Sequence, residues 1–254
     1  MIDLAQTAGE LEATGLVRHG FFGRQGGVST GEFDSLNVSV STGDNSDNVE
    51  RNRAIVAENL GSAPLVTLKQ VHSTRVVTVE AGAIPDRAIE ADALVTRRAD
   101  ILIGVLTADC APLLLVDPHA GIIGAAHAGW AGAVGGILEN TVTAMEALGA
   151  QRRRILLAIG PTISGENYEV GEEFKAKALS INPAAANAFF TPPAGKPHFD
   201  LPAFLVAEAQ SIGLPPASNL AQCTYAQPQA YFSHRHATHQ GKRTGRQISV
   251  IGLV

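Results

Sequence analysis

Three short apolar runs dominate the stretch from Ile101 to Trp130, and they constrain the fold more than any other feature of the chain. The runs are Ile101–Leu106, Leu113–Val116 and Gly121–Ala126, and each is bounded by Asp, Pro or Gly. Short runs of Ile, Leu and Val between turn residues are typical of strands buried on both faces, rather than of helices. The sequence therefore predicts a core of adjacent buried strands.

The residues that follow these runs carry metal-binding chemistry. Cys110 follows the first run and His127 follows the third, while His72 ends another apolar run, Leu65–Val71. A lone buried histidine or cysteine is usually structural. These three, however, lie where predicted strands break and have small residues beside them, so we expect them to converge. Two imidazoles and a thiolate with a vacant fourth position are what a catalytic zinc ion requires.

The same residues allow a reaction without metal. Cys110 could act as a nucleophile with His127 or His72 as its base, and Asp109 or Asp92 could orient that base. If the site binds zinc, Asp109 is instead a candidate acid–base residue beside the metal. The spacing of the residues does not distinguish zinc catalysis from metal-free catalysis by Cys110.

Copper is the alternative metal, because two histidines and one cysteine also describe a blue-copper site. Such sites usually add a weak axial methionine, and the chain has only Met1 and Met145. A multicopper oxidase would need many more paired histidines than the eight present. The one His-x-His pair, His234 and His236 with His239 nearby, is interpreted as an exposed polar turn rather than a second metal site.

Composition narrows the class of protein. The 254 residues carry a net charge of −5 and no basic patch, which argues against nucleic-acid binding. No apolar run approaches the length of a membrane span, and the N-terminus does not resemble a signal peptide. Two cysteines do not make a disulfide framework. We therefore expect a cytoplasmic enzyme with one domain over residues 1–254 and no membrane partner.

Several flanking elements are also predictable. A glycine-rich segment over residues 21–33 is interpreted as a hairpin turn, although Arg24 within it could bind an anion. Alternating residues predict a strand over 35–45, and Ser46 or Asp47 is expected to cap the helix that follows. Residues 134–149 predict one amphipathic helix, and Asp200 is expected to cap another.

Motifs along the whole chain resemble one known family. In order they include H-G-F-F-G-R-Q-G-G-V-S-T-G, S-L-N, K-Q-V-H-S, A-D-A-L-V-T, T-A-D-C-A-P-L-L-L, A-A-H-A-G-W-A-G, Y-E-V-G, C-T-Y and F-S-H-R. From His19 to Leu253 the chain resembles the YfiH family, once called the polyphenol oxidase or laccase-domain family and now regarded as purine nucleoside phosphorylases.

The resemblance implies a zinc enzyme built as an α/β/β/α sandwich of mixed sheets. It implies phosphorolysis of adenosine, inosine, guanosine and 5′-methylthioadenosine, and hydrolytic deamination of adenosine. The family's metal residues correspond to His72, Cys110 and His127 of this sequence. An amidase centred on Cys110 and acting on a peptidoglycan precursor is the alternative within the same family, and a copper-dependent polyphenol oxidase is another.

Candidate catalytic residues are Asp109 and Cys110. Nucleoside and phosphate are the expected partners, and the candidate residues for binding them are Arg24, Asn37, Gln70 and Arg235. Arg24 or Arg235 could bind the phosphate. The chain also departs from the family in its F-S-H-R-H segment, where His234 and His236 replace a tyrosine and an arginine. This difference could shift substrate preference, and the roles of both histidines stay open.

Overall fold

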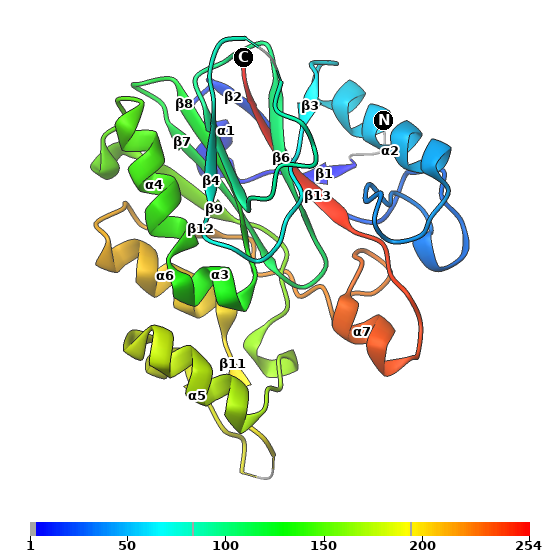
Figure 1. Ribbon diagram of the computed structural model, residues 1–254, viewed down its shortest axis with the longest axis vertical. Coiled ribbons are helices and arrows are strands. Elements are labelled where there is room, and N and C mark those ends of the chain that lie inside the picture. Colours follow the sequence, from blue (N-terminus) through cyan, green and yellow to red (C-terminus); the bar gives the residue numbers. More distant parts are fainter. Residues whose placement is uncertain (1–3, 83, 194) are drawn as a thin grey trace.

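The computed structural model describes residues 4–82, 84–193 and 195–254 and contains two large mixed β-sheets (Figure 1). The five-stranded sheet has the order β1 (Ala5–Gln6), β2 (Val17–Phe22), β13 (Gln247–Leu253), β6 (Leu102–Thr107) and β3 (Leu65–Val66). The six-stranded sheet has the order β12 (Ser218–Asn219), β9 (Leu156–Ile159), β7 (Ala111–Asp117), β8 (Ile122–Ala128), β5 (Ala93–Thr96) and β4 (Val76–Val79).

Seven α-helices accompany the sheets within the described residues. They are α1 (Gly9–Glu12), α2 (Ser46–Asn59), α3 (Trp130–Gly135), α4 (Ile137–Ala147), α5 (Glu172–Ile181), α6 (Leu201–Ser211) and α7 (His234–His239). A small two-stranded sheet pairs β10 (Phe189–Phe190) with β11 (His198–Phe199). In Figure 1, α4 and α6 lie on one side of the sheets and α2 lies on the other. None of these helices has both the length and the apolar character needed to cross a bilayer.

Alternating side chains divide the core into layers. Along β7, Leu114 and Val116 pack between the two sheets, while Leu113 and Leu115 belong to the cluster that contacts α4 and α6. Along β6, Ile103 and Val105 point into the space between the sheets. Because successive residues of a strand point to opposite faces, both faces of both sheets are buried. The predicted α/β/β/α sandwich of mixed sheets is confirmed.

Strand register brings the predicted metal ligands together. Strands β7 and β8 are antiparallel, with Pro112 opposite His127. Cys110, one residue before β7, therefore lies next to the end of β8 that carries His127. Strand β5 pairs with the other edge of β8, with Ala93 opposite Ala126, and this register places Asp92 beside His127.

Local structure differs from the sequence prediction in several places. The expected strand over 35–45 does not form, and the glycine-rich segment does not join two strands of a hairpin. Asn45, not Ser46 or Asp47, caps α2 by accepting hydrogen bonds from two backbone N–H groups. The helix expected over 134–149 is broken at Gly136, whose φ of 94° is a left-handed conformation that glycine adopts without strain. Asp200 caps α6 as predicted.

Candidate metal centre

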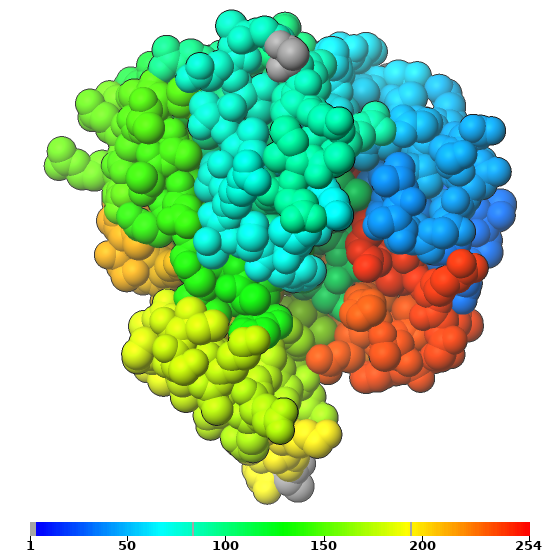
Figure 2. Space-filling view, viewed as in Figure 1, coloured from blue at the N-terminus to red at the C-terminus, as the bar shows by residue number. Residues whose placement is uncertain are grey.

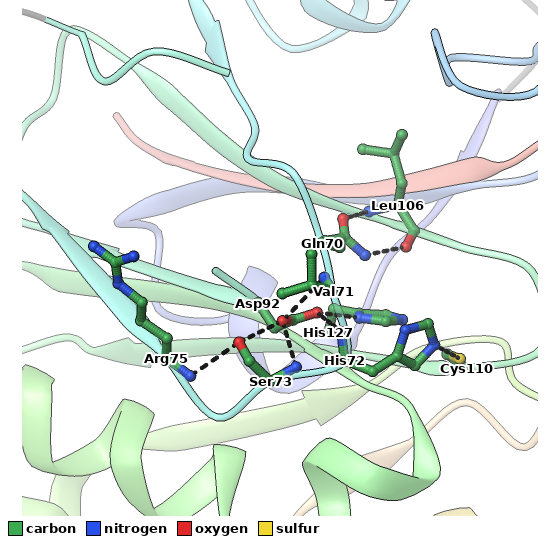
Figure 3. A network of polar contacts seen from close by, with 9 residues as sticks. All are labelled: Gln70, Val71, His72, Ser73, Arg75, Asp92, Leu106, Cys110 and His127. Carbon is green, nitrogen blue, oxygen red and sulfur yellow. Dashed lines mark hydrogen bonds and ion pairs between the residues drawn. The ribbon is translucent and has the colours of Figure 1, made fainter. Parts of the chain in front are cut away.

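Two imidazoles and a thiol from three distant segments meet at one end of the six-stranded sheet. One potential ligand atom from each of His72, Cys110 and His127 lies within 4.8 Å of the other two. Sγ of Cys110 is 3.7 Å from Nε2 of His72, and the two imidazole rings have centroids 4.8 Å apart (Figure 3). Within the described residues, no other set of three or more His, Cys, Asp or Glu side chains converges in this way.

Asp92 contacts the imidazole of His127 and the backbone of His72 (Figure 3). Its carboxylate lies 2.8 Å from Nδ1 of His127, and it accepts hydrogen bonds from the backbone N–H of His72 at 3.0 Å and that of Ser73 at 2.7 Å. A carboxylate can only accept, so Nδ1 of His127 carries a proton and Nε2 is the nitrogen that can bind a metal. A carboxylate that orients a ligating histidine is a common feature of metal sites.

The charges at the centre stabilise one another. Burial alone would raise the pKa of the Cys110 thiol, but the positive charge of His127 and hydrogen bonds from both imidazoles lower it to about 6. Burial would lower the pKa of His127, but the thiolate charge and the Asp92 hydrogen bond raise it to about 9. Without metal, the pair is therefore a thiolate and an imidazolium near neutral pH. The thiolate is also the form that binds metal.

Backbone strain marks the same place. His72 has a φ of 60° and Asp109 a φ of 83°, which are left-handed conformations that side chains rarely adopt. Gly129 follows β8, and a Cβ atom there would overlap the ring of His72 and lie 3.2 Å from Sγ of Cys110. Strained residues of this kind persist only where the surroundings hold them, and they cluster at functional sites.

Asp109 lies beside the centre with its carboxylate fully engaged. One oxygen accepts from Oγ1 of Thr224 at 2.6 Å, and the other accepts from the backbone N–H of Arg235 at 2.6 Å. Its backbone carbonyl also accepts from Oγ1 of Thr162 at 2.7 Å. Asp109 therefore ties α7 and the segment after β9 to the turn that carries Cys110.

A cavity of about 750 Å³ opens onto the three ligands. Its walls come from residues 38–41, 67–70 and 86–88 and from the end of β6. Figure 2 shows the surface hollowed where the blue and cyan segments meet, with the red C-terminal segment at the lower edge. A smaller cavity of about 200 Å³ reaches His72 and Cys110 from the side of Asp109 and Tyr168. His234 lines both cavities.

Two of the candidate substrate residues line these cavities. Gln70 lines the large one, although its amide exchanges two hydrogen bonds with the backbone of Leu106, at 2.7 and 2.8 Å. Arg235 lines the small one, with its guanidinium 5.3 Å from the ring centre of Tyr168 and one N–H donated to the carbonyl of Glu169.

The other two candidates, Arg24 and Asn37, line neither cavity. The Arg24 guanidinium donates to the carbonyls of Asp34 at 2.7 Å and Pro228 at 2.9 Å, and it stacks on Phe232. Asn37 is fully buried, and its amide contacts Asp44 and the backbone N–H of Arg246. Both side chains hold loops in place.

The structure adds residues that the sequence did not single out for the site. Arg53 and Arg246 line the large cavity. From the sequence, Asp92 is predicted only to orient the histidine base of a Cys110 nucleophile. No local motif marks these residues, because they come from a helix, a strand edge and the C-terminal segment. His236 and His239 instead contact Gln240 and Tyr225.

Comparison with known proteins places this arrangement in a family. Residues 18–254 match the family described as "Multi-copper polyphenol oxidoreductase laccase". The chain belongs to this family. It is 40% identical over 242 residues to a purine nucleoside phosphorylase of Deinococcus radiodurans, covering 93% of this chain and 89% of the relative. It is 34% identical over 233 residues to the purine nucleoside phosphorylase YfiH of Escherichia coli, covering 91% of each. The YfiH resemblance is confirmed.

Solved structures of the family have the same fold. The hypothetical protein YfiH of Bacillus licheniformis superposes with a TM-score of 0.84 at 31% identity, covering 94% of this chain and 93% of that one. A Neisseria meningitidis protein superposes with a TM-score of 0.83 at 35% identity, covering 93% and 94%. The family description mentions copper, whereas the relatives are named for phosphorolysis.

The donor set of this chain fits a single metal ion. One sulfur and two imidazole nitrogens suit zinc or copper, and the oriented His127 presents a free Nε2. Met145 is fully buried in the cluster on the outer face of the six-stranded sheet, away from the three ligands, and Met1 lies outside the described residues. An axial methionine from position 145 is therefore excluded.

Proposed function

We propose that this chain is a zinc-dependent purine nucleoside phosphorylase that accepts adenosine, inosine, guanosine and 5′-methylthioadenosine and also deaminates adenosine. The observation that carries the proposal is the convergence of His72, Cys110 and His127 on the wall of a cavity of about 750 Å³. This volume falls in the usual range for small-molecule sites. Relatives that are 40% and 34% identical to this chain are named purine nucleoside phosphorylases.

Each residue has a definite task in this proposal. His72, Cys110 and His127 would hold the ion through two nitrogens and a sulfur, and Asp92 would keep His127 in the correct tautomer. Zinc bound there would act as a Lewis acid that polarises a bound oxygen.

Asp109 is the acid–base candidate from the sequence, and the geometry favours a different task. Both of its oxygens already accept hydrogen bonds, from Thr224 and from the backbone of Arg235. We therefore propose that Asp109 positions α7 and the Cys110 turn. His234 lines both cavities next to the ligands and is better placed to move a proton during deamination.

One observation favours a second candidate function. The pKa of Cys110 is lowered to about 6 and that of His127 is raised to about 9, which is the thiolate–imidazolium state of a cysteine nucleophile. An amidase centred on Cys110 would use this state directly, with Asp92 orienting His127. Such an enzyme would act without metal.

Metal analysis combined with product analysis separates the two functions. The purified protein is assayed for bound zinc and copper and incubated with adenosine or inosine, with and without phosphate. We expect one zinc per chain, ribose 1-phosphate only when phosphate is present, and inosine from adenosine in either case. Cys110→Ala should lose the zinc and at least a thousandfold of the activity, because a three-ligand site cannot spare its thiolate.

Cys223→Ala is the matched control, since Cys223 is the other free cysteine and contacts Ser164 and Asn167 rather than the centre. Its activity should match the wild type. Activity on an amide that survives chelation would instead support the amidase. Turnover of a phenol that follows copper content would support the oxidase named in the family description.

A further inference from the structure

A buried arginine in the large cavity has no acidic partner. Arg53 of α2 is 6% exposed, and its guanidinium donates to the carbonyl of Val38 at 3.2 Å and to Oγ1 of Thr67 at 2.8 Å. Both acceptors are neutral, and Nε has no hydrogen-bond partner. Among the ion pairs of the described residues, none involves Arg53. Two of its five N–H groups are thus engaged within the protein.

Two other basic residues on this wall, Lys69 and Arg87, are paired with acidic side chains. Lys69 pairs with Glu90 at 2.8 Å and Arg87 pairs with Glu50 at 2.7 Å, and all four side chains are more than half exposed. Arg53 differs because burial and the nearby positive charge of Arg87 lower its pKa to about 10. The charge of Glu50 opposes this lowering of the pKa of Arg53, but Glu50 is already paired with Arg87. A buried guanidinium without an ion pair of its own is costly to maintain, and a bound anion would offset that cost.

Two more polar groups face the same cavity. Arg246 lines it and donates to the carbonyls of Thr244 and Gly245 rather than to a carboxylate. Thr107 also lines it, is 1% exposed, and has a hydroxyl without a hydrogen-bond partner. Arg246 precedes Gln247, which pairs with Thr107 across β13 and β6, and the same cavity is lined by Cys110 and His127. The cluster therefore lies beside the metal ligands.

We propose that Arg53, Arg246 and Thr107 form a phosphate subsite, and that inorganic phosphate binds there as the co-substrate of the reaction. Guanidinium groups match the paired oxygens of phosphate, and a buried hydroxyl supplies one more donor. The assignment rests on the proposed phosphorolysis. It differs from the expectation for Arg24, whose guanidinium is occupied by backbone carbonyls and an aromatic ring.

Phosphorolysis at this subsite would form one bond at C1′ of the nucleoside and break another. An oxygen of hydrogen phosphate attacks C1′ of the nucleoside and forms the new C–O bond, while the bond from C1′ to the base nitrogen breaks and its electron pair leaves with the base. The proton of hydrogen phosphate passes to the base, so the products are the free base and ribose 1-phosphate. Arg53 and Arg246 would hold the phosphate with its oxygen toward C1′.

Direct titration of the zinc-loaded protein with inorganic phosphate, without nucleoside, tests the subsite. Arg53→Met keeps the length of the side chain and removes its charge and donors. We expect this variant to bind phosphate at least tenfold more weakly, because hydrogen bonds to charged groups contribute strongly. Thr107→Val should weaken binding about threefold, as expected for a single neutral hydrogen bond. Arg87→Met is the matched control, because Arg87 lines the same cavity but is exposed and paired.

Folding and ligand source have separate readouts. Circular dichroism and zinc content verify that each variant is folded, and Arg53→Lys, which keeps the charge, should show an intermediate loss. In assays with inosine, Arg53→Met should raise the KM for phosphate with little change in the KM for inosine. Titration with adenosine 5′-monophosphate tests whether the subsite instead serves a phosphate carried by the nucleoside.

The outcomes are distinct. If phosphate binding depends on Arg53 but the protein does not cleave nucleosides, the proposed function is wrong and the phosphate site is still supported. A wild-type protein that binds no phosphate at millimolar concentration would overturn the subsite, as would equal losses in Arg53→Met and Arg87→Met. An effect of Arg53→Met on the monophosphate alone would also overturn it.

Discussion

Two regions of this molecule are crowded with polar side chains, and they use them in opposite ways. At the metal centre, Sγ of Cys110 and one nitrogen from each of His72 and His127 face one another and a cavity. In the loop over residues 23–44, the side chains of Arg24 and Asn37 instead form hydrogen bonds that hold the loop and its neighbouring segments in place. Polar side chains thus face a cavity in one region and bond to the backbone in the other.

The difference follows from how each backbone satisfies its hydrogen bonds. At the metal centre, the ladders of β5, β7 and β8 satisfy most of the main chain around His127, and Asp92 accepts the backbone N–H groups of His72 and Ser73. The side chains of His72, Cys110 and His127 therefore remain free for other partners. The loop has no ladder, and its carbonyls and N–H groups rely on side chains such as Asn52, which donates to the carbonyls of Ser35 and Asn37. Unsatisfied polar atoms beside a cavity therefore indicate function better than polar residues alone.

The most severe test of this contrast within the metal centre is Asp92→Asn. The substitution keeps the shape of the side chain, but it places an amide where His127 and Ser73 need a carboxylate. Loss of an orienting carboxylate typically weakens metal binding about 10- to 100-fold. We expect this loss for zinc in competition with a chromophoric chelator, together with a parallel loss of activity.

Asp117→Asn is the matched control for that variant. Asp117 lies at the far end of β7, is equally buried, and accepts hydrogen bonds from the backbone of His119, Ala120 and Gln151. It should lose stability without losing zinc affinity. Equal zinc affinity in the Asp92 variant and the wild type would show that Asp92 supports the fold alone, and the contrast between the two regions would fail.

Acid stability provides a second readout of Asp92. Burial would raise its pKa, but hydrogen bonds from His127 and Ser73 lower it to about 2, below the ordinary value of 3.8. A carboxyl whose pKa is lowered by folding stabilises the protein above its unfolded pKa, and this contribution is lost as the pH falls toward 2. Metal-free Asp92→Asn should therefore lose less stability than metal-free wild type between pH 4 and pH 2 in chemical denaturation.

The alkylation rates of the two free cysteines, Cys110 and Cys223, test the metal centre with a smaller expected effect. In metal-free protein near pH 7, we expect iodoacetamide to modify Cys110 about tenfold faster than in a His127→Asn variant, because the imidazoles lower the pKa of its thiol to about 6. The rate should persist down to about pH 6 and fall below it. Cys223, which contacts a hydroxyl and an amide, is the internal reference in the same peptide map. Modification of Cys110 at the same rate in both proteins would contradict the thiolate–imidazolium pair.

The apolar pattern of the sequence predicted the central strands and the convergence of His72, Cys110 and His127. The runs around Cys110 and His127 became β6, β7 and β8, because residues buried on both faces of a strand leave a continuous apolar signal. The loop over residues 35–45 was not predictable in the same way. Its alternating Val and Ser residues imitate a strand, but no neighbouring strand pairs with it.

Tertiary partners decide the rest of the site. Arg53 looks like an ordinary surface residue of α2 in the sequence, and only the walls of the cavity show that it is buried without an acid. Asp92 looks like a turn residue until the register of β5 and β8 places it against His127. Which polar side chain faces a ligand and which faces a carbonyl depends on long-range contacts that local patterns do not contain.

Arg24→Met tests the loop side of the contrast and carries the smallest expected effect. Methionine preserves packing on Phe232 but removes the donors to the carbonyls of Asp34 and Pro228 and the cation over the ring. We expect a loss of about 1–2 kcal/mol in the free energy of unfolding, measured by chemical denaturation. Arg51→Met, which removes only an exposed pair with Glu58, should change stability by less than about 0.5 kcal/mol.

Zinc content and the KM for phosphate should stay at wild-type values in both variants. A raised KM for phosphate in Arg24→Met with unchanged stability would make Arg24 an anion ligand, and the loop would then belong with the metal centre as part of the site.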